Sequence, residues 1–295
     1  IPSLVLIMAI IALVEKPSIW YVMAVIGIIS WTSIARLTRA EFMKLAYQRR
    51  TWGLFAAAVF LAVLATALTP WALSRMQNVV VLPLSLPAAV DSVYSKALGA
   101  YIMSLVVGIV IMSSEFQHHT AIATFLATPK RINVLTSKLI TAAVWGALIN
   151  FVATALGMVS GAIALSFFKN VAAADSYIFV DYLCSALLIG AVLGVVGVAI
   201  GTLIRNQNAA VSTGLVLFLI VDRILAVVWT EGGKYLPSGL ITGMMQLHLN
   251  LKDRASGFSL NTADYLEPWP AAGLLLGYGI VFAAISLITL RRDID

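Results

Sequence analysis

The residues of this sequence that could carry chemistry gather at residues 113–131, SSEFQHHTAIATFLATPKR, between two apolar runs. Glu115, two adjacent histidines and two cations would suit a metal or proton site. On a helix, however, His118 and His119 point about 100° apart, so they cannot ligate one metal ion together. The remaining histidine, His248, falls on the opposite side of the membrane in the topology derived below. No metal site is therefore expected.

Sequence motifs for ATP binding and hydrolysis are missing. The chain has no GxxxxGK[ST] phosphate loop and no HExxH sequence, and no Ser/His/Asp set is suggested by spacing. If the protein uses ATP, another chain must bind it. We therefore expect a protein that is not itself an enzyme, with no catalytic residue and no cofactor of its own.

A second pair of ionisable residues, Asp222 and Arg223, lies inside the apolar run 209–229, nearer its outer end. Ionisable groups at membrane depth are costly and often mark a transport pathway. Alternatively, the pair sits at the outer interface, where Arg223 extends to the surface or meets Asp181. The sequence does not decide between these two interpretations, and we treat Asp222 and Arg223 as a candidate pathway site.

The composition assigns the chain to the membrane. Of its 295 residues, 61% are hydrophobic and 11% are charged, and the mean hydropathy is +0.98. A soluble domain carries about 25% charged residues, and one water-soluble core could not bury this apolar surplus. We therefore predict an all-α polytopic membrane protein, because six apolar runs approach the ~20 residues that a bilayer crossing needs. These runs cover residues 53–73, 97–114, 138–166, 178–203, 209–229 and 270–290.

Lysine and arginine in the loops set the orientation of these spans. If the segment before residue 53 is cytoplasmic, that side carries most of the loop cations, and both ends of the six-span unit face the cytoplasm. The net charge of +6 is not gathered on one soluble face, so no nucleic-acid partner is expected. The expected location is the cytoplasmic membrane of a bacterial cell.

Residues 34–50, IARLTRAEFMKLAYQRR, differ from the spans. Apolar residues, Phe42 among them, recur at helical spacing, and basic residues lie mostly elsewhere round the helix. This pattern predicts an amphipathic helix along the inner membrane surface. A cytoplasmic flank without a role of its own is the alternative. The basic residues are Arg36, Arg39, Lys44, Arg49 and Arg50.

Two further segments are expected to form short helices. Within residues 113–131, Ile122, Phe125 and Leu126 fall on adjoining turns, and Pro129 ends the helix before the next span. An exposed apolar face bracketed by charges has the form of a docking element. Residues 231–269 are too polar to cross the bilayer, and we expect one or two helices there that dip into the outer leaflet.

The stretch 115–139, EFQHHTAIATFLATPKRINVLTSKL, resembles the loop after the second span of permeases from ABC-2-type ATP-binding-cassette exporters. In that family an acid opens the segment, and a T-x-x-x-LATP-[KR]-R run leads to V-L-x-x-K-L. The stretch TRAEFMKL, the outer YLPSGL and the terminal RRD also resemble this family, so the resemblance covers about 36–295. The matching residues are Glu115, Thr120, Leu126, Ala127, Thr128, Pro129, Lys130, Arg131, Val134, Leu135, Lys138 and Leu139.

The resemblance implies six spans, an N-terminal amphipathic helix, a coupling helix between spans two and three, and re-entrant helices before span six. It implies a pair of permease subunits, identical or homologous, in membrane lipid, with two ATPase subunits that hold ATP and Mg. Their closure would move the coupling helices and export an unidentified substrate. The residues implied in coupling are Glu115, Thr120, Ile122, Phe125, Leu126, Pro129, Lys130 and Arg131.

The first residues have another resemblance. Residues 1–45 are similar to a piece of dipeptide or oligopeptide importer permeases, in the pattern IPSLLL…P…V…AIGI-x-SW…ARLxRAE. The importer's ATPase-contacting EAA loop should follow, but LAYQRRTWGL stands there. We therefore divide the chain into an N-terminal apolar segment, 1–35, with one or two extra helices, and a transmembrane domain, 36–295. A peptide importer permease and an ion-coupled secondary transporter remain as alternatives.

Overall fold

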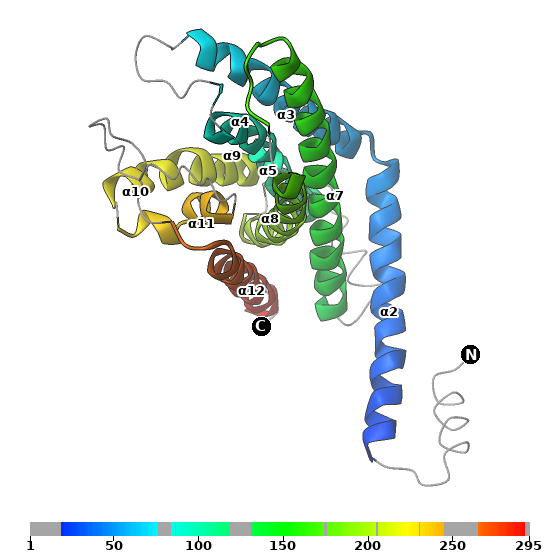
Figure 1. Cartoon of the computed structure of the whole chain (residues 1–295). Coiled ribbons are helices and arrows are strands. Elements are labelled where there is room, and N and C mark those ends of the chain that lie inside the picture. Colours follow the sequence, from blue (N-terminus) through cyan, green and yellow to red (C-terminus); the bar gives the residue numbers. More distant parts are fainter. Residues whose placement is uncertain are drawn as a thin grey trace.

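The computed structural model describes residues 19–75, 84–85, 87–117, 131–173, 176–204, 206–229, 231–244 and 265–292. Helices dominate these residues, and no strand occurs among them, so the all-α prediction is confirmed for the described part of the chain (Figure 1). The predicted coupling helix at residues 120–127 and most of the outer segment after residue 244 lie outside the described residues.

Within the described part of the chain, six helical stretches are long and apolar enough to cross a membrane, as the sequence predicts for a multi-pass protein. They overlap the six predicted runs and extend several of them by a turn or more. Their bounds are Arg49–Arg75, Ala89–Gln117, Ile132–Ser166, Phe179–Leu203, Gln207–Ala226 and Pro268–Thr289.

The N-terminal part differs from the prediction. Helix α2 (Ile19–Tyr47) runs without interruption through the expected boundary at residues 35 and 36. The predicted amphipathic segment is therefore the second half of a longer helix, which packs beside α7 (Arg131–Ser166) in Figure 1. Only Gln48 separates α2 from α3 (Arg49–Arg75), and the chain changes direction there.

The second span is assembled from three pieces, α4 (Pro87–Ser95), a 3₁₀ turn (Lys96–Ala100) and α5 (Tyr101–Gln117). Of its apolar window, 83% is buried inside the protein, against 22% for α3 and 17% for Gln207–Ala226. The second span is thus the central element. Few residues of α3, α9 (Gln207–Val216) and α12 (Pro268–Arg292) are fully buried, a pattern expected of helices that face lipid.

Close helix packing around α5 depends on residues without side chains. Gly108 of α5 lies against Gly194 and Gly197 of α8 (Ser176–Leu203), and Gly146 of α7 lies against Gly190 of α8. A Cβ added at Gly108 would collide with the carbonyl oxygen of Gly194. Apolar side chains do not drive helices together in lipid, so small residues that let backbones approach supply much of the association.

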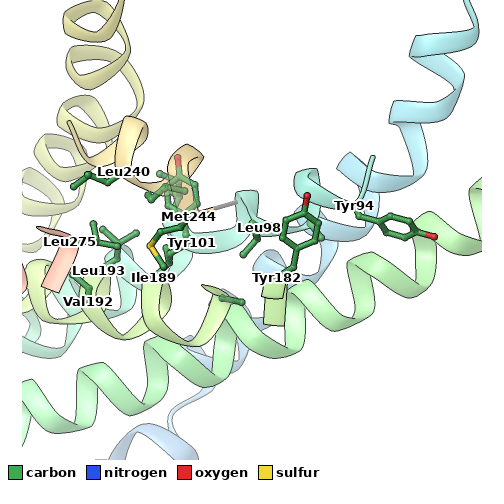
Figure 2. Packing of buried hydrophobic residues seen from close by; sticks show 14 of the residues in the cluster. Tyr94, Leu98, Tyr101, Tyr182, Ile189, Val192, Leu193, Leu240, Met244 and Leu275 are labelled. Carbon is green, nitrogen blue, oxygen red and sulfur yellow. The ribbon is translucent and has the colours of Figure 1, made fainter. Parts of the chain in front are cut away.

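A large apolar cluster joins several helices of the bundle. Side chains from α5, α8, α11 (Pro237–Met244) and α12 meet there, with Tyr101, Ile189, Leu240, Met244 and Leu275 among them (Figure 2). Pro237 and Pro268 stand at the first positions of α11 and α12, where a missing N–H costs no hydrogen bond. With eight residues, α11 is too short to cross a bilayer.

We predict that Gly108→Val destabilises the bundle by at least about 1–3 kcal/mol, because the new side chain meets backbone that cannot move aside. The measurement is the thermal midpoint of the detergent-solubilised protein. Gly277→Val is the matched control, since a Cβ at Gly277 of α12 meets nothing within 4 Å. Equal midpoints for the two variants would contradict the packing described here.

Candidate functional site: a buried charge cluster beside the α5–α7 connection

Four charged side chains from three helices meet where α5 ends and α7 begins. We call them the charge cluster: Glu41 and Lys44 of α2, Glu115 of α5, and Lys138 of α7. The Lys138 Nζ lies 2.6 Å from Oε1 of Glu115 and 3.1 Å from Oε1 of Glu41. The Lys44 Nζ donates to the same Glu115 oxygen at 3.2 Å.

Helix geometry brings these groups together. Glu41 and Lys44 are three residues apart on α2, so they share one face. Glu115 is two residues from the end of α5, and Lys138 lies two turns into α7. Helix α7 has 36 residues and is about 54 Å long, whereas the hydrocarbon core is about 30 Å thick. Its first turns can therefore extend beyond the hydrocarbon, where charges cost less.

An aromatic contact holds α2 in place beside the cluster. The rings of Phe42 and Trp145 stack with centroids 5.1 Å apart, and Trp52 of α3 meets Trp145 edge-on at 6.5 Å. The Trp52 indole N–H donates to the backbone oxygen of Ala46 at 2.7 Å, which closes the turn between α2 and α3. The end of α2 is thus fixed to α7 by stacking and by charge.

The charge cluster is buried unevenly. Lys138 is 0% exposed and Glu115 is 1% exposed, whereas Glu41 is 14% and Lys44 is 51% exposed. Two ammonium groups face two carboxylates, so the formal charges balance. Desolvating such ions costs several kcal/mol each, and the attraction between them repays this cost only when the partners stay in place. The arrangement therefore specifies the position of the three helices more than it adds stability.

We predict that Lys138→Ala lowers the free energy of unfolding by about 3–5 kcal/mol, because it leaves two carboxylates without their buried counter-ion. Lys44→Ala removes a half-exposed partner and should cost about 1 kcal/mol or less. Denaturant unfolding followed by tryptophan fluorescence measures both. If the two variants unfold alike, Lys138 is not the anchor of the cluster.

The structure places some of the residues predicted for coupling. Glu115 lies in the charge cluster, where its Oε1 accepts a hydrogen bond from Lys44 of α2. Arg131 is the first residue of α7, and its side chain is outside the described part of the chain. The other predicted residues, Thr120, Ile122, Phe125, Leu126, Pro129 and Lys130, lie in the segment 118–130, outside the described residues.

The residues predicted for the amphipathic helix divide into two groups. Arg36 and Arg39 are exposed, as membrane-surface cations would be. Phe42 instead stacks on Trp145, and Lys44 reaches Glu115, so this part of α2 faces protein.

Sequence reasoning missed two members of the cluster, Glu41 and Lys138. From the sequence, Lys138 is only one of the matching residues in the stretch 115–139, whereas the structure places it in α7 and buries it. One signal in the sequence indicates the pair of Lys138 and Glu115: a lysine stands at the start of one apolar run, and a glutamate stands at the end of the preceding run. A short connection between two helices brings such ends together.

The candidate pathway pair separates in the structure. Asp222 is 7% exposed, and its Oδ2 accepts a hydrogen bond from the backbone N–H of Ser238 at 3.2 Å, at the start of α11. It directly follows a π-helical turn, Leu217–Val221, and begins α10 (Asp222–Val228). Arg223 is exposed, and no ion pair joins it to Asp181 among the described residues. Asp222 therefore serves as a cap for α11.

We predict that Asp222→Ala destabilises the packing of α11 by about 0.5–2 kcal/mol, the usual loss for a helix cap. Asp222→Asn keeps an acceptor oxygen and should retain most of that stability. Hydrogen exchange of the α11 amides reports the effect locally. Equal protection of α11 in the alanine variant and the unaltered protein would exclude the capping role.

Metal-binding geometry is not found in the described part of the chain, where no three His, Cys, Asp or Glu side chains gather round one point. His118, His119 and His248 are outside that part.

Comparison with known proteins adds no assignment. No protein-family model matches the chain, and no curated protein matches it. The six candidate spans and the charge cluster are therefore the features of the chain that bear on its function.

Proposed function

We propose that this chain is the membrane-spanning permease subunit of an ATP-driven exporter. A separate ATPase subunit would bind ATP and Mg and dock on the segment 118–130. The charge cluster carries the proposal, because it joins both helices that flank this segment to a third helix, α2. The substrate would cross the cytoplasmic membrane of a bacterium through a pair of such subunits, identical or homologous.

The cluster suits the transmission of movement. A push on the segment 118–130 would act on the end of α5 and the start of α7, which Lys138 and Glu115 hold together at 2.6 Å. A buried ion pair resists separation because each charge would lose its closest buried counter-charge in a low-dielectric site. The two helices and α2 would therefore move as one body.

Helix α5 would pass that movement to the centre of the bundle. It belongs to the most buried of the candidate spans, and its glycine lies in backbone contact with α8. Packed elements of this kind change between discrete arrangements rather than deforming continuously. A displacement at one end of α5 would thus alter the pathway between the spans.

The docking step is tested by co-expression with an ABC ATPase encoded beside this chain. We predict that Phe125→Glu with Leu126→Glu abolishes co-purification, because charges replace the apolar contact surface. Tyr177→Glu is the control, since Tyr177 is 82% exposed at the start of α8, the opposite end of the span from the α5–α7 connection. Unchanged co-purification of the double variant would exclude docking at this segment.

A secondary carrier is the second candidate. One observation favours it: Asp222 is buried, and its Oδ1 has no hydrogen-bond partner among the described residues. A carboxylate in such a position can take up a proton or a cation. Transport that persists without ATP and collapses with an uncoupler would support this candidate over the exporter.

A further inference from the structure

A cavity of about 560 Å³ lies between α3, α5 and α9. Its volume falls in the range of about 300–1,000 Å³ that small-molecule sites occupy. Neither the charge cluster nor Asp222 lines it. The cavity instead opens beside the start of α3 and the start of α9, at the ends of two exposed candidate spans.

The walls of this cavity are of two kinds. Leu54, Val106, Val110 and other aliphatic side chains form an apolar part. Arg50, Gln207 and Asn208 form a polar edge at the same ends of α3 and α9. Among the described residues that line the cavity, Arg50 alone is charged, and none is acidic.

The polar edge favours a negative charge. Arg50 offers a planar group of N–H donors that suits carboxylate and phosphate. The start of α9 adds the positive end of a helix dipole. Asn206 already accepts the hydrogen bonds of the Asn208 and Ala209 amides, at 3.0 and 3.2 Å, so α9 contributes its field and Arg50 the direct contact.

Gly53 leaves the cavity wall open next to Arg50. A Cβ added at Gly53 would meet nothing within 4 Å, so a larger side chain there can enter the cavity without displacing protein atoms. Gly273 of α12 is also exposed and equally free of neighbours, but it does not line the cavity. Gly53 and Gly273 therefore form a matched pair of positions for a larger side chain, one lining the cavity and one outside it.

We propose that this cavity binds an anionic amphiphile, with the acidic group at Arg50 and the apolar chain along Leu54, Val106 and Val110. An amphiphile of this class is the substrate that the permease would receive from the lipid layer next to the ends of α3 and α9. This transport role rests on the proposed function, whereas binding requires no ATPase.

Binding is measured with the purified chain in nanodiscs of phosphatidylcholine, with no ATPase present. The probe is a dansyl-labelled undecanoate, and its methyl ester is the uncharged comparison. We expect saturable binding of the carboxylate, about tenfold tighter than that of the ester, as one charge-assisted hydrogen bond provides. Unlabelled dodecyl phosphate should displace the carboxylate, and dodecyl trimethylammonium should not.

Four variants assign the binding to the cavity. Arg50→Gln should weaken carboxylate binding about tenfold, to the level of the ester, whereas Arg75→Gln at the other end of α3 should leave it unchanged. Gly53→Phe should weaken binding of both probes at least tenfold, and Gly273→Phe should not.

Three results would overturn the proposal: no saturable carboxylate binding, equal affinity for the carboxylate and the ester, or full binding by Gly53→Phe. Each can occur while the ATPase still co-purifies, so the proposed function would stand. Conversely, a chain without an ATPase partner could still pass every binding test.

Discussion

The ion pair between Lys138 and Glu115 is the constraint on which the bundle depends where α5 ends and α7 begins. Both groups are buried, and their atoms lie 2.6 Å apart. Breaking the pair would leave a charge in a medium that cannot solvate it, so α5 and α7 must stay together at this end. Lys44 and Glu41 extend the constraint to α2. The two helices that flank the segment 118–130 are therefore held to each other and to α2.

In the rest of the structure, burial decreases from the centre of the bundle to its periphery. At the centre, glycines such as Gly108 and Gly194 bring α5 and α8 into backbone contact. Outside them, few residues of α3, α9 and α12 are fully buried. The cavity lies where the buried α5 meets the exposed α3 and α9, so a movement of α5 would change its walls. The proposed coupling and the proposed binding site are joined by this one helix.

The sequence predicts the spans well because a bilayer crossing needs a long apolar run and little else. It does not predict that Asp222 caps α11 or that Lys138 belongs to the charge cluster. Both depend on contacts between residues far apart in the chain, Asp222 with Ser238 and Lys138 with Glu41. The single α2 was also missed, because a change from apolar to amphipathic composition was interpreted as a boundary, although a helix continues through such a change.

The most direct test of the account is the distance between α2 and α7, measured by pulsed electron spin resonance. Spin labels at Met43 and Ile132, both about two-fifths exposed, would report it in a Cys184→Ser background. We predict one narrow distance distribution with Lys138 present and a broad or longer one in Lys138→Met. An identical narrow distribution in both would contradict the claim that the charge cluster holds these helices together.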